Sequence, residues 1–306
     1  MSPRLSVVIA TCHRPSVLAR TLERLTPDHQ RIPADTLEVI VTDDSRDAAT
    51  QVMAEQRFPD ARYVRGPGRG PAANRNCGAA AARGEWIAFI DDDCQPADGW
   101  AAAMCQHGAD AGLDVIEGRI VVPDKYDSPF RRHVENLVGG NFWTGNLAIR
   151  RSAFERLGGF DEDFLEAGGE DMEFGERIRR SGIRTIFCPE ATVIHPSHIV
   201  SWRYLFWRAF LIKWHLLFML KTGQGLPPEA PAWKALVFLV SSRTMMLLRT
   251  TWHAVGRHSE SRRTTWFDIA ASWLMFPIIL PYLAYWELRF RRQLRERHLT
   301  ALSQSA

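Results

Sequence analysis

The sequence predicts an α/β fold in which a parallel sheet is covered by helices. Apolar segments of strand length alternate with segments of helical periodicity through residues 1–198. Connections of this length between such segments are typical of parallel strands joined by crossover helices. Beyond residue 198 the chain becomes basic and aromatic, which predicts a separate helical extension over residues 199–306.

The expected elements follow in order from the N-terminus. Leu5–Ala10 is apolar and predicts a strand, and Ser16–Leu25 predicts a helix because its apolar residues recur on one face. Leu37–Thr42 predicts a second strand, and the Gly/Pro-rich segment Arg65–Pro71 predicts a loop. The remaining expected elements are the helix Ala72–Ala82, the strands Trp86–Ile90, Val115–Val122 and Gly145–Ile149, the helices Arg151–Leu157 and Asp171–Ser181, and the strand Thr185–Cys188.

Three consecutive carboxylates, Asp91-Asp92-Asp93, close the apolar segment Trp86–Ile90. Adjacent acids repel one another, so crowding them at the end of a buried strand costs stability unless a cation compensates. A hard divalent ion such as Mg²⁺ or Mn²⁺ prefers oxygen ligands and keeps positions for phosphate oxygens. Because ligands of parallel α/β sheets bind beyond the carboxyl ends of the strands, this position favours a ligand site over a solvated acidic turn.

The overall charge of +3 hides an asymmetry along the chain. Residues 199–306 hold fifteen Lys and Arg against five Asp and Glu, a net of +10, and subtracting this from +3 leaves −7 for residues 1–198. The basic part also holds eight of the eleven Trp residues. Such a segment suits an anionic surface, for which membrane headgroups and nucleic acid are both candidates.

The uncharged eighteen-residue segment Ile269–Trp286 favours lipid over nucleic acid. As a helix it would span about 27 Å, close to the hydrocarbon thickness of a bilayer, and Pro277 and Pro281 would kink it. A re-entrant or interfacial helix pair fits this length as well as a true span does. A helical extension packed on the preceding domain is the third alternative.

The five cysteines, whose number is odd and whose spacing is not that of a metal site, favour reduced thiols in a cytosolic setting. The apolar run Leu5–Ala10 is too short for the core of a signal peptide. We therefore expect residues 1–198 to stay in the cytoplasm, at the inner face of the cell membrane.

Five motifs in this order resemble the family 2 glycosyltransferases, which are inverting enzymes with the GT-A fold. The motifs are Leu5–Thr11, Val39–Ser45, Asn74–Gly78 with Gly84–Asp93, Gly145-Asn146 with Arg151–Asp161, and Gly169–Asp171. Each is weak alone, but five in register across residues 5–198 form a specific signal. The resemblance implies a GT-A type nucleotide-diphospho-sugar transferase sheet over residues 1–198, and the composition predicts a membrane-associated helical region over residues 199–306.

The resemblance also implies a Mn²⁺ or Mg²⁺ cofactor. Asp93 is expected to be the direct metal ligand, and Asp91 and His195 are further candidates. Asp92 is expected to contribute through water, ribose or the metal. His195 has an alternative interpretation as a polar loop residue.

The expected donor site gathers residues from several segments. The resemblance places Asp44 and Asp43 at the nucleobase, with Thr11 lining the base pocket. The predicted donor site also includes Arg75 and Asn76, which would contact the diphosphate or ribose, and Asp91 and Asp92. Glu170 completes it and would orient the acceptor or support the structure. Each short motif also has a structural alternative, namely a turn or cap for the Thr and Asp residues and an exposed helix cation for Arg75.

Asp171 is the predicted general base. In an inverting transfer an acceptor hydroxyl attacks the anomeric carbon in a single displacement, and a carboxylate that takes its proton contributes about 10²–10⁴ in rate. The helix expected to begin here keeps a carboxylate ionised through its positive end. The alternative is an ordinary acidic cap at a first helical turn.

The predicted function is therefore inverting sugar transfer to an acceptor hydroxyl. A UDP sugar is the first expectation for the donor, and a lipid-linked or cell-envelope glycan for the acceptor. Val200–Trp207 lacks the Gln-x-x-Arg-Trp motif of processive relatives, which disfavours a polymer synthase. The alternatives are a catalytically silent nucleotide-sugar-binding protein and a nucleotidyltransferase. The latter would need a Gly-rich first loop, which Thr11–Pro15 lacks.

Overall fold

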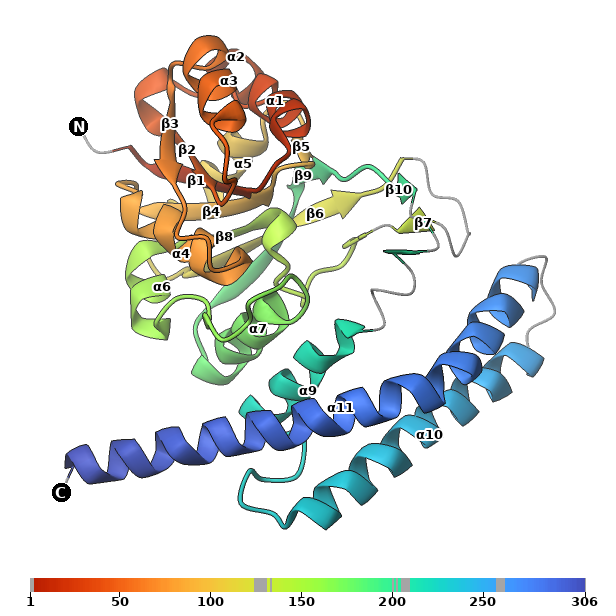
Figure 1. Cartoon of the computed structure of the whole chain (residues 1–306). Coiled ribbons are helices and arrows are strands. Elements are labelled where there is room, and N and C mark those ends of the chain that lie inside the picture. The colour runs from red at the N-terminus through yellow and green to blue at the C-terminus, as the bar shows by residue number, and fades with distance from the viewer. Residues whose placement is uncertain are drawn as a thin grey trace. The chain divides into compact units, whose positions relative to one another are not determined.

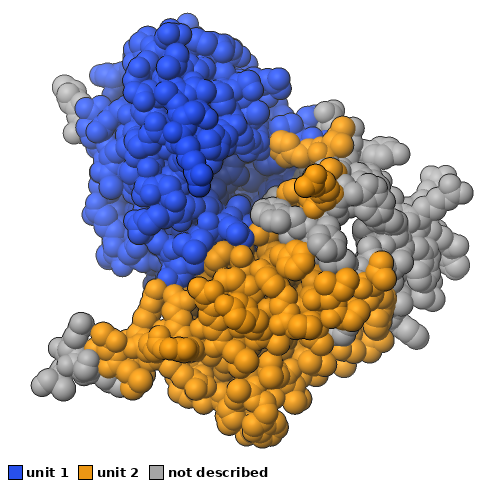
Figure 2. Space-filling view, in the orientation of Figure 1, with its two compact units in different colours: residues 1–125, 133–197 blue, residues 126–132, 198–306 orange. Residues whose placement is uncertain are grey.

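The computed structural model describes residues 3–123, 131–132, 134–199, 201, 203–204, 210–256 and 262–305. The chain divides into two compact units (Figures 1 and 2). Residues 1–125 and 133–197 form one, which we call the sheet unit, and residues 126–132 and 198–306 form the other, the helical unit.

The sheet unit is built on eight strands in the order β3-β2-β1-β4-β8-β6-β9-β5. The strands are β1 (Leu5–Thr11), β2 (Leu37–Asp43), β3 (Ala61–Arg65), β4 (Trp86–Asp91), β5 (Gln95–Pro96), β6 (Val115–Val121), β8 (Leu147–Arg150) and β9 (Thr185–Ile194). The predicted α/β class is confirmed, and β3, β2, β1 and β4 run parallel as expected.

The expectation of a parallel sheet throughout is wrong, because β8 runs antiparallel to both β4 and β6. Parallel neighbours need a crossover, whereas antiparallel neighbours can be joined at the same edge of the sheet. The chain between β6 and β8 returns at the edge where β6 ends. The 3₁₀ turn η2 (Thr144–Asn146), which precedes β8, therefore contacts β4 at its carboxyl end.

Helices cover both faces of the sheet (Figure 1). Successive residues of a strand point to opposite faces, so on β1 Val7 and Ile9 pack into one apolar core and Val8 into the other. The first core receives α1 (Pro15–Glu23), α3 (Ala49–Arg57) and α5 (Trp100–His107), and the second receives α4 (Pro71–Ala81), α6 (Arg151–Leu157) and α7 (Glu170–Ser181). Two short helical turns, α2 (Pro27–Gln30) and η1 (Ala34–Thr36), precede β2.

Strand β9 is longer than the predicted strand Thr185–Cys188 and continues to Ile194. The register of β9 against β6 shifts after Cys188, where Pro189 and Glu190 interrupt the apolar pattern. Such an irregularity hides the second half of a strand from sequence patterns. His195 therefore follows the strand directly instead of a turn after Cys188.

The helical unit contains α9 (Ile212–Lys221), α10 (Ala232–Gly256) and α11 (Arg262–Ser305), with the small strands β7 (Arg131–Arg132) and β10 (His198–Ile199). Helix α11 contains the segment Ile269–Trp286 and continues through Pro277 and Pro281. An apolar core joins the three helices. Among the described residues, no helix combines the length and the apolar content that crossing a membrane requires.

Candidate active site

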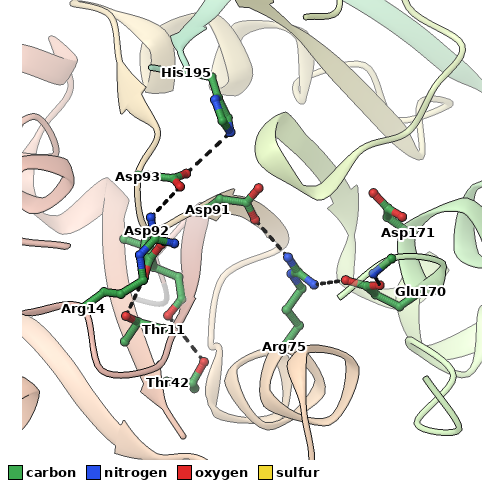
Figure 3. A network of polar contacts seen from close by, with 12 residues as sticks. Thr11, Arg14, Thr42, Arg75, Asp91, Asp92, Asp93, Glu170, Asp171 and His195 are labelled. Atoms are coloured by element: carbon green, nitrogen blue, oxygen red, sulfur yellow. Dashed lines mark hydrogen bonds and ion pairs between the residues drawn. The ribbon is translucent and has the colours of Figure 1, made fainter. Parts of the chain in front are cut away.

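The predicted acidic residues lie at the carboxyl end of β4 (Figure 3). Asp91 is the last residue of the strand, and Asp93 lies in the turn that follows. One Asp93 oxygen accepts a hydrogen bond of 2.7 Å from Arg14, and the other lies 3.6 Å from Nε2 of His195. Strands β4 and β9, which are not neighbours in the sheet, thus bring an acid and an imidazole together.

These residues form a candidate metal site. Ligand atoms of Asp91, Asp93, Cys94 and His195 all lie within 4.8 Å of one another. Carboxylate oxygens and an imidazole nitrogen suit Mn²⁺ and related ions. Burial raises the pKa of the Cys94 thiol well above its usual value, so this sulfur stays protonated and is a poor ligand.

Asp92 faces away from this set and is 3% exposed. Its two oxygens accept hydrogen bonds of 2.7 Å from Thr11 Oγ1 and from Arg14. Burial raises the pKa of Asp92 to about 6, although Arg14 opposes the rise. Asp92 and Thr11 therefore fasten the end of β4 to the end of β1, and their predicted contacts with the donor stay predictions.

Arg14 is the residue that the sequence analysis missed. It lies three residues beyond the end of β1 and donates to both Asp92 and Asp93. Since β1 and β4 are adjacent parallel strands, the loops after them meet at one edge of the sheet. The signal was only partial, because an acidic triplet needs a nearby cation but the strand end that supplies it depends on the strand order.

Arg75 links the end of β4 to the start of α7. It donates to Oδ1 of Asp91 at 2.9 Å and to Oε1 of Glu170 at 2.9 Å. The other oxygen of Glu170 accepts the backbone N–H groups of Gly168 and Gly169. The structure thus places Arg75 in a buried ion-pair bridge, and the exposed-cation alternative does not hold.

Asp171 lies half-buried beside this bridge, on the first turn of α7 (Figure 3). Gly168 and Gly169 approach it with φ values of 130° and 155°, a region that residues with a side chain rarely adopt. Burial, and then the negative charge of Glu170, raise the pKa of Asp171 to about 7, while Arg75 opposes the rise. A carboxyl group with this pKa can exchange a proton near neutral pH.

The two acids after β2 hold the backbone in the described structure. Asp43 is fully buried and accepts hydrogen bonds from the Ser45 backbone and hydroxyl and from Tyr63. Asp44 accepts the N–H groups of Gly68 and Gly70 and so shapes the loop before α4. This geometry matches the turn-forming alternative, and a nucleobase contact stays a prediction.

Asn76 is also engaged by the chain itself. Its amide donates to the carbonyl of Phe160 at 2.8 Å and accepts the Phe160 N–H at 2.8 Å. The predicted contact with a diphosphate therefore has no geometric support. Gly145 lies against the acids instead, since a side-chain carbon there would meet Asp91 Oδ2 at 3.4 Å.

A mixed sheet that carries an acidic cluster after β4 and a carboxyl group at the start of α7 defines the GT-A class of fold. The mannosyltransferase PcManGT from Pyrobaculum calidifontis, solved with GDP-Man and Mn²⁺, matches with a TM-score of 0.58 at 21% identity, over 94% of this chain and 88% of that one. Residues 1–349 of S. aureus TarS, solved with UDP-GlcNAc, match with a TM-score of 0.53 at 17% identity, over 97% and 92%. At these identities the likeness shows the fold.

The sequence model of glycosyl transferase family 2 matches residues 6–160, and the chain belongs to this family. A second model, described as the N-terminal domain of galactosyltransferase, matches residues 130–199. The validoxylamine A glucosyltransferase of Streptomyces hygroscopicus subsp. jinggangensis is 30% identical over 242 residues, which cover 64% of this chain and 56% of that protein. The chain thus spans about half the length of the first curated relatives it matches.

Proposed function

We propose that this chain transfers a sugar from a nucleotide-diphosphate donor to an acceptor hydroxyl, with inversion at the anomeric carbon. The observation that carries the proposal is one polar network, which joins Asp91 at the end of β4 to the start of α7 through Arg75 and Glu170. Asp171 follows Glu170 on the first turn of α7 and lies beside that network (Figure 3). Membership of glycosyl transferase family 2 supports the proposal.

Mn²⁺ or Mg²⁺ is the proposed cofactor, held by Asp93 and Asp91 with His195. The donor atoms fit such an ion, because they are hard oxygens and one imidazole nitrogen within 4.8 Å. When bound, the ion neutralises the charge that develops on the leaving diphosphate. The presence of Mn²⁺ in the PcManGT structure is in line with this assignment.

Asp171 takes the proton from the attacking hydroxyl. Its pKa of about 7 suits this role, since a general base works best when its pKa lies near the operating pH. Arg75 and two backbone N–H groups hold Glu170 in place. The first turn of α7, and Asp171 with it, is thereby kept in a fixed position at the edge of the sheet.

The proposed donor is a UDP sugar, and the proposed acceptor is a lipid-linked or cell-envelope glycan at the cytoplasmic face of the inner membrane. The net charge of +10 over residues 199–306 supports the membrane location, because anionic headgroups attract basic segments.

A thermal-shift panel tests the donor and the metal together. Ligands that bind the folded state raise the melting temperature. We expect UDP with Mn²⁺ to raise it more than GDP, dTDP or CDP, and UDP without Mn²⁺ to raise it less. Equal melting temperatures with and without every nucleotide would contradict the proposal.

Replacement of the base tests the mechanism. Asp171→Asn is expected to lower kcat about 10²–10⁴-fold while nucleotide binding is retained. The matched control is Glu176→Gln, which changes an acid on the same helix that is paired with Arg179 and Arg180. We expect the control to keep its activity, and the product of the active enzyme to carry the inverted anomer.

A further inference from the structure

The helical unit exposes an unusual amount of apolar surface. Among the described residues, it carries twelve exposed large apolar side chains, whereas the much longer sheet unit carries five. Monomeric proteins in water rarely leave contiguous apolar surface uncovered, and large exposed patches mark interaction sites. The difference points to the helical unit as a docking surface.

Most of the exposed apolar residues follow one side of each long helix, and Met245 of α10 and Trp273 of α11 lie outside it. At about 100° per residue, Trp233, Val237, Val240 and Leu248 of α10 fall within about 80° of arc. The same geometry on α11 places Leu274, Ile278, Tyr285 and Leu288 within about 80°. We call these two sets the outer stripes.

The opposite sides of the two helices are buried. Ala235 and Leu239 of α10 and Ile279 and Leu283 of α11 are at most 7% exposed, and they fall roughly opposite the outer stripes at about 100° per residue. Leu239, Ile279 and Leu283 share one core with Leu216 of α9. The stripes therefore are not the faces by which these helices pack together.

Three charged residues are buried inside this unit with partners, whereas the buried Nη2 of Arg243 has no hydrogen bond among the described residues. Glu287 and Arg291 are 5% and 2% exposed, and Arg291 donates to Glu287 at 2.9 Å. Arg291 also donates to the backbone carbonyls of Leu226 and Pro227. Lys213 is 9% exposed, and its Nζ lies 4.8 Å from the ring centroids of both Trp214 and Trp286.

Apolar residues outside and paired charges inside form the arrangement that a lipid environment favours. In water, apolar exposure and charge burial both cost free energy. In hydrocarbon the apolar stripe costs nothing, and charged groups belong in the interior, paired with one another or with backbone carbonyls. A neighbouring protein copy could also cover an apolar stripe, but it would gain nothing from the basic charge of the region.

We propose that the outer stripes of α10 and α11 lie in the surface of an anionic bilayer. The flanking charges agree with an anionic partner. Lys234 lies over the ring of Trp233 at one end of α10, and Arg289 and Arg292 are exposed beyond the stripe of α11. Trp and Lys at such positions anchor helices at headgroup depth. This surface includes none of the proposed catalytic residues, so its test does not depend on the proposed transfer.

Vesicle flotation tests the proposal with the full chain. We expect the chain to float with phosphatidylglycerol vesicles, and to float less with phosphatidylcholine vesicles or at high salt, which screens headgroup attraction. The double variant Val237→Ser/Ile278→Ser removes one apolar residue from each stripe and is expected to lower partitioning about tenfold for each residue. Val52→Ser is the matched control, because Val52 is 46% exposed in the sheet unit.

Two results would overturn the proposal. One is flotation that the double variant leaves unchanged, or that Val52→Ser reduces as much. The other is a lipid-free dimer, measured by light scattering, that the double variant converts to a monomer while flotation is absent. Circular dichroism of each variant confirms that its helices are retained, so a loss of flotation reports on the stripes.

Discussion

The sheet unit places apolar side chains inside and its chemistry at one edge, whereas the helical unit buries paired charges beside its apolar core and exposes large apolar side chains. Val7, Ile9 and Phe89 of the sheet unit are fully buried, and its acidic cluster lies where the strands end. In the helical unit Arg291 is 2% exposed, while Leu274 is 73% exposed. The difference agrees with the proposal that the outer stripes of the helical unit lie against lipid.

Both units bury an arginine–carboxylate pair, and the two pairs also differ. Arg75 bridges Asp91 and Glu170 beside the half-buried Asp171, where β4 ends and α7 begins. Arg291 pairs with Glu287 and is closed off by backbone carbonyls. A pair beside a group with a raised pKa indicates function, whereas a fully enclosed pair indicates structure.

The largest expected effect comes from the acidic triplet, in which neighbouring acids should behave differently. Asp93→Asn is expected to weaken Mn²⁺-dependent nucleotide binding at least about 100-fold, since even loss of a group that only supports a metal ligand costs about 10–100-fold. Asp92→Asn should retain that binding, because Asp92 points to Thr11 and Arg14. Calorimetric titration measures both. Equal losses in the two variants would contradict the assignment.

The two buried arginines provide the next comparison. Arg75→Met and Arg291→Met each leave a buried carboxylate without its main partner, and each is expected to lower the free energy of unfolding by about 3 kcal/mol. Only Arg75→Met should also lower kcat, because Arg75 fixes the start of α7. Urea unfolding and initial rates measure the two effects. An Arg291→Met variant that loses as much kcat would remove the distinction between the pairs.

Much of the sheet unit could be predicted from sequence because its patterns are local. Trp86–Ile90 and Arg151–Leu157 were predicted almost to the residue. Strand β3 was missed because it lies at the sheet edge with only partly buried residues, and its apolar alternation is weak. Helix α5 was missed because its own residues are apolar on nearly all sides, so the sequence shows no apolar stripe with a helical period.

The site was predictable only in part, for a related reason. The acids after β4 and the acid pair at the start of α7 could be predicted, because each group lies at the end of one element that the sequence itself indicates. The bridge from Arg75 to Glu170 spans 95 residues, and it depends on which strands and helices are neighbours. Local periodicity does not determine the order of strands in a sheet. Neither this bridge nor the Arg14 contacts could therefore be derived from the periodicity.

Adjacent residues of α11 sharpen the contrast between inside and outside. Ile279 is 7% exposed and Ile278 is 53% exposed. In lipid-free solution Ile279→Ala is expected to cost about 2–4 kcal/mol because it leaves a cavity, and Ile278→Ala less than about 0.5 kcal/mol. Partitioning to anionic vesicles is expected to show the reverse order. Ile278→Ala should reduce it more than Ile279→Ala does, since only Ile278 faces the proposed lipid surface. Urea unfolding and flotation measure the two quantities. Equal costs would mean that α11 is rotated relative to this structure.

The smallest effect is the pH dependence at the sheet edge. With a pKa of about 7, the Asp171 carboxyl group is protonated below neutral pH and cannot accept a proton. We therefore expect kcat/KM, which reports the pKa values of the free enzyme, to rise with pH, to reach half its plateau near pH 7, and to be about one-tenth of the plateau at pH 6. Initial rates at substrate concentrations well below KM measure this.

Glu170→Gln measures the part of the shift that the charge of Glu170 contributes. Burial is the larger cause of the raised pKa of Asp171 and the negative charge of Glu170 adds to it, so removing that charge should move the acid limb of the profile part of the way to lower pH. The Gln side chain keeps an oxygen that can accept from Arg75, so the bridge to the start of α7 is retained. Glu176→Gln, on the same helix, is the control for a general loss of negative charge. A limb that stays near pH 7 in Glu170→Gln, or that shifts equally in the control, would mean that the charge of Glu170 does not raise the pKa of the group that controls the rate.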